Sequence, residues 1–367
     1  MAMKFTINKD AFIAGLQQVQ HVVSSRTTLP ILSNVLIRAS KQGLQLATTD
    51  LDVSVSGYIE AEVKEPGGTT LPARRLFSII RELPVDEVEV SVDDKNIAHI
   101  RCGPSHFKIN GLSDTEFPQL PTFSDAKEFK LEQRVLKECL RKTSYAISTD
   151  EMRFVLNGIF CSFKDNRLTM VATDGRRLAM AEQDLEFPQS NECDIIIPTK
   201  AVNEIQRLLG DEGEVILRVG AGQMGLEMDS YTLTSKLIEG NYPNYRQVIP
   251  GDTKERIALE REPLLRTIAR VSLLLVDKSN SVKLRFTRDN LKVEANAPDV
   301  GEAHEDMPIS YKGADITIAF NPEFLMAPLR NLNSDEVHLH LIDEISPGVI
   351  RTGANFLYVI MPMRVNS

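Results

Sequence analysis

The chain of 367 residues contains one pattern of secondary structure three times. Three segments begin alike, at Phe5, Phe129 and Ile257, each with a short alternating strand that leads into an amphipathic helix. Two alternating strands joined by a short polar turn follow, and then a second strand, helix and strand. Because the period of about 125 residues is too long for a solenoid repeat, each copy is predicted to be a domain.

The repeat also predicts the fold class and the domain limits. Each copy should hold two helices packed on antiparallel sheet, an α+β arrangement with the helices on one side. The stretches PTFSDAKE and PGDTKE separate the copies. We therefore predict domains at residues 1–122, 128–250 and 255–367.

Charge and cysteine content exclude several classes of protein. The formal net charge of -9 argues against a surface that coats nucleic acid or an acidic membrane throughout, but it does not exclude a local basic face. The four cysteines show no CxxC pair and no metal-ligand spacing, which is typical of reduced cytosolic thiols. The chain begins without an apolar signal core, and no stretch approaches the length of a membrane span. We expect a cytoplasmic protein.

Two aspartates recur at equivalent positions. Asp50 and Asp174 occupy the same place in the first two copies, and Asn296 lies near that place in the third. This repetition favours a turn in which the carboxylate holds backbone amides. The glycine pattern GAGQMG at 220–225 resembles a nucleotide-binding loop, but a strand rather than a helix follows it, so a hairpin turn is predicted.

No catalytic or cofactor-binding motif is recognised in the sequence. His338 and His340 alternate on one strand without a third ligand nearby, so we predict no metal site. There is no Walker loop, no GxSxG and no Cys/His pair of a known catalytic type. We predict a non-catalytic protein without a cofactor. The alternative is an enzyme that uses Asp174, Arg176 and Arg177 on a small acidic substrate.

The order of several longer motifs resembles the bacterial DNA sliding clamps, the beta subunits of DNA polymerase III. TLPILSNVL, ATDGRRLAM, SKLIEGNYPNYRQVIP and YVIMPMR stand in that family's order between Phe5 and Val365. The resemblance implies a head-to-tail homodimer, a ring of six domains around double-stranded DNA. It also implies a processivity factor that tethers the polymerase III catalytic subunit and other replication and repair proteins. An ATP-driven clamp loader would open the ring.

Basic residues on the expected helices give a physical reason for DNA in such a ring. Contacts from these cations to phosphates would be independent of sequence and sensitive to salt. For any one of these cations, the alternative is a solvated surface charge without a role in binding. For the whole chain, the alternative is a scaffold protein that binds peptides but never DNA. The resemblance implies these DNA-binding residues: Arg26, Arg74, Arg81, Lys137, Arg141, Lys200 and Arg207.

The end of the chain, YVIMPMR, is unusually apolar for a terminus. The resemblance implies that it walls a hydrophobic cleft which receives short peptides from replication proteins, and two methionines suit a groove that repacks around several partners. Arg176 and Gln247 differ from residues common in relatives, which leaves the peptide preference open. The implied cleft residues are Leu156, Thr173, Gly175, Arg176, Arg177, Leu178, Pro243, Val248, Val359, Ile360, Met361, Pro362, Met363 and Arg364.

A further set of apolar residues is implied at the contact between two chains. In the family, edge strands and an apolar patch join the third domain of one chain to the first domain of the other. Here Phe107 and Ile109 would face Leu273 and Leu274. A buried helix end is the alternative for each leucine. Pairing of two edge strands would also protect edges that otherwise promote aggregation.

Overall fold

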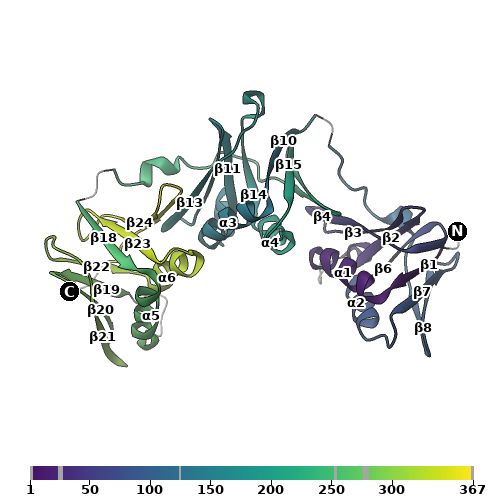
Figure 1. Cartoon of the computed structure of the whole chain (residues 1–367), viewed down its shortest axis with the longest axis horizontal. Helices are drawn as coiled ribbons and strands as arrows, with labels where there is room; N and C mark the ends of the chain where they lie inside the picture. Colours follow the sequence, from purple (N-terminus) through teal and green to yellow (C-terminus); the bar gives the residue numbers. More distant parts are fainter. Residues whose placement is uncertain (1–2, 24–27, 124, 252–253, 276–280, 365–367) are drawn as a thin grey trace. The chain divides into compact units, whose positions relative to one another are not determined.

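The computed structural model describes residues 3–23, 28–123, 125–251, 254–275 and 281–364 (Figure 1). Its helices and strands follow the threefold repeat. The first copy contains β1 (Met3–Asn8), α1 (Lys9–Val19), β2 (Asn34–Ser40), β3 (Gly43–Thr49), β4 (Val53–Ile59), β5 (Glu62–Glu65), β6 (Gly67–Pro72), α2 (Ala73–Arg81), β7 (Glu87–Val92), β8 (Ile97–Cys102) and β9 (Ser105–Asn110).

The second and third copies keep this order, except that one strand replaces β5 and β6. The second contains β10 (Lys127–Glu132), α3 (Gln133–Thr143), β11 (Gly158–Lys164), β12 (Arg167–Thr173), β13 (Arg177–Asp184), β14 (Cys193–Pro198), α4 (Thr199–Leu208), β15 (Glu214–Gly220), β16 (Gln223–Met228) and β17 (Tyr231–Lys236). The third contains β18 (Glu255–Glu260), α5 (Arg261–Val271), β19 (Val282–Thr287), β20 (Asn290–Ala297), β21 (Gly301–Pro308), β22 (Ile316–Phe320), α6 (Pro322–Asn331), β23 (Glu336–Leu341), β24 (Gly348–Thr352) and β25 (Phe356–Ile360). The predicted α+β class, with two helices per copy on antiparallel sheet, is confirmed.

The chain forms two compact units. Unit 1 comprises residues 1–137 and 203–237, and unit 2 comprises residues 138–202 and 238–367. Unit 1 holds a five-stranded sheet in the order β5-β1-β7-β8-β9 and an eight-stranded sheet in the order β10-β15-β16-β17-β4-β3-β2-β6. Unit 2 holds an eight-stranded sheet in the order β14-β11-β12-β13-β25-β24-β23-β18 and a four-stranded sheet in the order β21-β20-β19-β22.

Helix α1 shows how local sequence begins a helix and sets it against its sheet. Asn8 caps the helix, because its side-chain oxygen accepts the backbone N–H groups of Asp10 (2.9 Å) and Ala11 (3.2 Å). Gly15 lets the helix approach the sheet, since an added Cβ would lie 2.9 Å from Ile59 Cγ2. Helices α1 and α2 pack together in unit 1, as α5 and α6 do in unit 2 (Figure 1). One apolar stripe of α1 is buried at Phe12, Leu16 and Val19.

Each eight-stranded sheet contains strands from two copies. In unit 1, β17 pairs antiparallel with β4, and Leu233 lies opposite Val55. In unit 2, β25 pairs antiparallel with β13, and Tyr358 lies opposite Ala179. In both cases the last strand of one copy joins the fourth strand of the copy before it. We call these two pairings the internal junctions.

Both internal junctions end in corresponding hydrogen bonds. The N–H of Tyr58 donates to the Ser230 carbonyl (3.1 Å), and in the second junction the N–H of Glu182 donates to the Asn355 carbonyl (2.9 Å). At the other end, the N–H of Lys236 donates to the Asp52 backbone carbonyl (2.9 Å), and the N–H of Met361 donates to the Arg176 backbone carbonyl (2.9 Å). The two pairings therefore share one register, and the apolar end of the chain is first of all a buried strand of such a junction.

Candidate functional site

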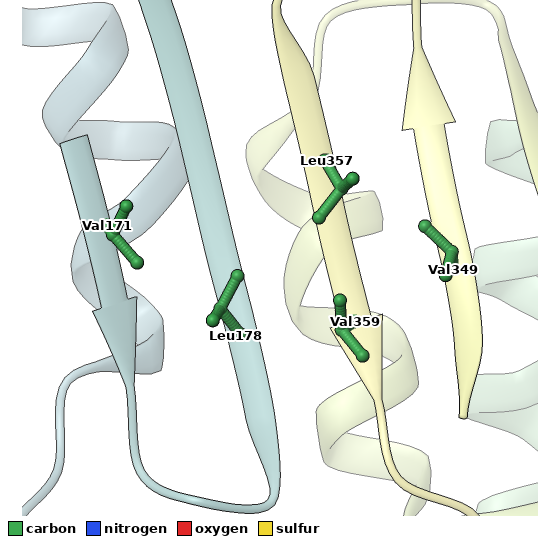
Figure 2. Close-up of a cluster of buried hydrophobic side chains, with 5 residues drawn as sticks. All are labelled: Val171, Leu178, Val349, Leu357 and Val359. Atoms are coloured by element: carbon green, nitrogen blue, oxygen red, sulfur yellow. The ribbon is translucent and has the colours of Figure 1, made fainter. Parts of the chain in front are cut away.

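Five buried side chains form an apolar row on the eight-stranded sheet of unit 2. The row consists of Val171, Leu178, Val349, Leu357 and Val359. They come from four neighbouring strands, β12, β13, β25 and β24, and Figure 2 shows them side by side across the sheet. Leu178 lies directly opposite Val359, which in turn lies opposite Val349. Cross-strand pairing alone therefore brings residues far apart in sequence to one apolar surface.

Aromatic side chains from the segment before β18 pack on this row. Tyr242, Tyr245 and Ile249 contact it together with Phe160 of β11. The Phe160 and Tyr242 rings stack with centroids 5.0 Å apart, and the Tyr245 ring lies 5.9 Å from that of Phe160. Val248 in the same segment remains 52% exposed. The apolar row thus continues into a half-exposed, aromatic edge.

The turn before β13 fixes the orientation of Leu178. One carboxylate oxygen of Asp174 accepts the N–H groups of Arg176 (2.9 Å) and Arg177 (3.1 Å), and the other lies 3.0 Å from Arg177 Nε. Gly175 has a φ of 85°, where glycine is favoured. Asp50 likewise accepts the N–H groups of Asp52 and Val53. The prediction that these aspartates hold turn amides is confirmed, and the Asp174 carboxylate is committed to the turn.

Arg177 is held by a second group besides Asp174. Its guanidinium carbon lies 4.3 Å from the centre of the Phe324 ring on α6, a cation–π contact. The hydroxyl of Tyr358 donates to the Phe324 carbonyl at 2.7 Å. Arg177 therefore ties the turn to the third copy, and only 14% of its side chain is exposed.

The residues after β25 line a hollow of their own. Met361, Pro362, Met363 and Arg364 line a cavity of about 740 Å³ together with Thr317 and Ala319 of β22 and the loop residues Glu344 and Ile345. The N–H of Met363 donates to the Ala319 carbonyl at 2.8 Å, which aligns this segment with β22. Met361 is 44% exposed and Ile345 is 82% exposed. The end of the chain is therefore both a buried strand and the wall of a hollow that is lined by apolar and charged residues.

The remaining predicted cleft residues occupy varied environments. Leu156 is buried at the end of a short 3-10 helix (Glu151–Leu156), whereas Pro243 and Arg176 are exposed. Sequence reasoning missed Val171, Leu357, Val349, Phe160, Tyr242 and Tyr245. Val171 and Leu357 lie two residues before the predicted Thr173 and Val359, so the period of two along a strand could have identified them.

The predicted DNA-binding cations differ in their environments. Arg74, Arg81 and Lys200 are exposed on helices α2 and α4, whereas Arg26 lies outside the described residues. Lys137 Nζ lies 2.8 Å from an Asp211 carboxylate oxygen, and this hydrogen bond lowers the pKa of Asp211. The Arg141 guanidinium donates to the Asn333 side-chain oxygen at 2.9 Å. Lys137 and Arg141 are partly exposed, and single pairs of this kind contribute little to stability.

Arg207 is bound more firmly than the other cations. Its guanidinium donates to the backbone carbonyls of Gln18 (2.5 Å) and Gln17 (3.4 Å), near the end of α1, and lies 3.0 Å from a Glu204 carboxylate oxygen. Only 25% of its side chain is exposed. Arg207 therefore ties α4 to α1, a role that the sequence did not indicate.

A second hollow lies beside β9, at the edge of the five-stranded sheet. Phe107 and Ile109 line it together with Arg74, Arg75 and Ile79 of α2, and its volume is about 1120 Å³. Phe107 is 38% exposed. In unit 2, Leu273 is 83% exposed in a short 3-10 helix (Ser272–Leu274) that follows α5. Of the predicted contact residues, Phe107 and Ile109 therefore line a hollow, and Leu273 projects into solvent.

The glycine motif GAGQMG and His338 have ordinary structural environments. GAGQMG forms the β15–β16 turn, in which Gly220 pairs with Gln223, so the predicted hairpin is confirmed. Among the described residues, no group of three or more His, Cys, Asp or Glu could hold a metal ion. His338 lies 3.1 Å from a Glu336 carboxylate oxygen. Across the described parts of the chain, no helix is both long enough and apolar enough to span a membrane.

Comparisons with known proteins agree along the whole chain. Models of the N-terminal, central and C-terminal domains of the DNA polymerase III beta subunit match residues 3–121, 130–244 and 246–364. The beta sliding clamp of Chlamydia muridarum is 35% identical over 99% of this chain and 100% of its own, and that of Pseudomonas putida is 34% identical with the same coverage.

Solved structures show the same similarity. The sliding clamp from Bacillus subtilis superposes with a TM-score of 0.96 at 30% identity, covering 100% of both chains. The sliding clamp from Bartonella birtlesii, solved bound to griselimycin, superposes with a TM-score of 0.95 at 36% identity and the same coverage.

Proposed function

The chain belongs to the DNA polymerase III beta subunit family, the beta sliding clamps, and from this premise we propose that it is a processivity factor. Two copies form a head-to-tail ring that encircles double-stranded DNA, slides along it and tethers the replicative polymerase and other partners. The ring contains three domains from each chain, at residues 1–122, 128–250 and 255–367. The function is non-catalytic, is carried out in the cytoplasm and depends on an ATP-driven loader to open the ring.

The observation that carries this proposal is the repeated junction. The last strand of the second copy pairs with the fourth strand of the first, and the last strand of the third copy pairs with the fourth strand of the second. Only two of the equivalent strands in the described structure lack such a partner: β9, at the end of the five-stranded sheet, and β21, at the end of the four-stranded sheet. If β9 pairs with β21 of a second chain, both edges close, and two such seams complete a ring.

The internal junctions also predict the register of this seam. The last strands of the three copies begin at Ser105, Tyr231 and Phe356, each directly after the turn from the strand before it. Tyr231 pairs with Gly57, and Phe356 pairs with Ala181. Since Glu305 is the equivalent of Gly57 and Ala181 on β21, Ser105 should lie opposite Glu305 of the partner subunit.

The chemistry of the predicted pairs supports this register. Phe107 is equivalent to Leu233 and Tyr358, which are fully buried in the internal junctions, and it would lie opposite the partner's Ala303. Lys108 would lie opposite the partner's Glu302, an attractive pair of opposite charges. The hollow beside β9 would receive apolar groups such as Leu273 of the partner subunit, with Leu274 beside it.

DNA binding is proposed through phosphate contacts from the helices. Arg74, Arg81, Lys137, Arg141 and Lys200 project from helices of the first two copies, and Arg26 precedes them in the chain. Such contacts release counterions, so affinity for DNA should fall steeply as salt rises and should not depend on base sequence. Arg207 would act mainly by holding α4 against α1.

Partner binding is proposed at the apolar row and its half-exposed edge. The matching Bartonella birtlesii and Pseudomonas aeruginosa clamps were both solved bound to griselimycin, which supports ligand binding by this fold. A peptide that buries two or three Leu or Phe side chains gains roughly 1.5–3 kcal/mol from each. After ordering costs, an affinity near micromolar, about -8 kcal/mol, is expected, which suits partners that exchange.

One pair of cysteine substitutions tests the ring. Lys108→Cys and Glu302→Cys in the same chain should form two disulfides per dimer, because their Cα atoms would be about 5.5 Å apart. The matched control combines Lys108→Cys with Ala303→Cys, whose side chains point to opposite faces of the sheet. Protein diluted until the dimer dissociates, concentrated again with a circular plasmid and then oxidised should stay bound at high salt and be released when the plasmid is cut.

Two outcomes would refute the proposal. Equal cross-linking of the control pair would show that the seam does not have this register. Retention on DNA that does not depend on whether the plasmid is circular would show that the protein does not encircle DNA, even if dimers form.

A further inference from the structure

Two histidines lie together on the edge of the five-stranded sheet. His99 of β8 and His106 of β9 stack with ring centroids 5.5 Å apart and an angle of 11° between the rings. His99 Nδ1 lies 3.3 Å from His106 Nε2. Both side chains lie on the face that carries Arg101 and Lys108, because His99 pairs with Lys108 and Arg101 pairs with His106.

The spacing of these nitrogens suits one metal ion. Two imidazole nitrogens that bind Zn²⁺ at 2.0–2.1 Å in tetrahedral geometry are about 3.3–3.4 Å apart. The observed 3.3 Å matches this separation, although the stacked rings must rotate before both lone pairs point at a common ion. Two histidines on neighbouring strands provide only half of a tetrahedral site.

The proposed ring supplies a third histidine, and this inference therefore rests on the proposed function. The register that places Ser105 opposite Glu305 of the partner subunit places His106 directly opposite His304 of the partner subunit. The Cβ atoms of residues opposite one another on antiparallel strands are about 4.5–5.5 Å apart, so both rings can reach one ion. Three imidazoles would then converge at each seam.

The charges around these histidines permit a divalent cation. Arg101 and Lys108 lie on the same face and would repel it. Glu302 and Asp306 alternate with His304 on β21 and lie on the face of that histidine. In the proposed register, Lys108 lies opposite the partner's Glu302, which offsets one of these two cations.

We propose that each seam of the ring binds a divalent transition metal of the zinc class through His99, His106 and His304 of the partner subunit, with water in the fourth position. The metal binds the closed seam more tightly than the open one, because opening removes the third ligand. Zinc therefore strengthens the dimer.

Sedimentation of the full chain across a dilution series, in zinc sulfate or in EDTA, tests this proposal. At a free zinc concentration ten times the dissociation constant of the seam site, linkage at two seams should lower the dimer dissociation constant by up to about 100-fold. His304→Ala should form the same dimer in EDTA but lose most of the zinc effect. The matched control is His21→Ala, which removes an exposed histidine from the first copy and should keep the effect.

A second measurement reports the ligands directly. Equilibrium dialysis should find one zinc ion per protomer in the dimer, and cobalt(II) in its place should give the strong visible absorption of a tetrahedral site. A dimer that is equally strong in zinc and EDTA would overturn the metal site and leave the ring intact. A chain that forms no dimer in EDTA or zinc would overturn the ring and the metal site together.

Discussion

Substitution of the projecting leucine should weaken the dimer without affecting the fold of each chain. Leu273 is 83% exposed in the single chain, so Leu273→Ala removes almost no intramolecular packing. At the proposed seam, the loss of three carbons removes about 0.8 kcal/mol of burial free energy for each carbon. Because 83% of the Leu273 side chain is free to be buried there, the loss is about 2 kcal/mol per seam. With two seams per ring the loss is about 4 kcal/mol, which raises the dimer dissociation constant about a thousandfold.

Mass photometry of diluted protein measures this change, and the chain offers a matched control. Ile345 is 82% exposed and lies beside the hollow at the end of the chain, away from the proposed seam. Ile345→Ala should leave the dimer unchanged, and both variants should keep the melting temperature of the monomer. If Leu273→Ala and Ile345→Ala dissociate at the same concentration as the parent protein, the reasoning about Leu273 is wrong.

Three further results are expected. Val248→Asp should weaken the binding of a fluorescent Gln-Leu-Ser-Leu-Phe peptide at least tenfold in anisotropy titrations. It should not lower the stability of the fold, because Val248 is 52% exposed at the apolar edge. Unchanged binding would show that the peptide does not bind at this edge. At pH 8, Cys193, which is half-buried, should be the one thiol that reacts quickly with a thiol reagent. Cys102, Cys139 and Cys161 are buried, and burial raises the pKa of Cys139 to about 11. Rapid reaction of two or more thiols would contradict this prediction. Backbone hydrogen bonding, chiefly from the Ile97 N–H, lowers the pKa of Asp93 below its ordinary 3.8. The Asp93 carboxylate therefore stabilises the fold above that pH, and this stabilisation is lost as the pH falls through the folded-state pKa. Asp93→Asn should flatten the acid side of the curve of unfolding free energy against pH, measured in urea, and an unchanged curve would be evidence against this role.

Much of the fold could be predicted from the sequence because the information is local. Alternation along a strand and the spacing of apolar residues in a helix depend on near neighbours. Because the pattern occurs three times, the strands and helices expected in one copy could be checked against those expected in the other two. The turn role of Asp174 was equally accessible, because its carboxylate reaches amides only two and three residues away. The three family models then matched nearly the whole chain.

Features that depend on contacts between distant segments could not be predicted in this way. A period of two shows which face of a strand Leu178 occupies, but not that Val359 lies opposite it. The contact between Arg207 and the end of α1 joins residues 189 positions apart in sequence, and nothing in either segment indicates it. The stacking of His99 on His106 likewise depends on the register of a hairpin.

The internal junctions have a consequence for how the proposed ring comes apart. Each is an antiparallel strand pairing that would resemble the seam between chains in register and hydrogen bonding, and the difference lies in the covalent tether. A flexible tether holds its two ends at an effective concentration in the millimolar range, so a junction within one chain closes again as soon as it opens. A seam between chains has no tether and competes with dilution instead. Among joints of similar strength, the untethered seam of the proposed ring would open first, and a loader would need to act there alone.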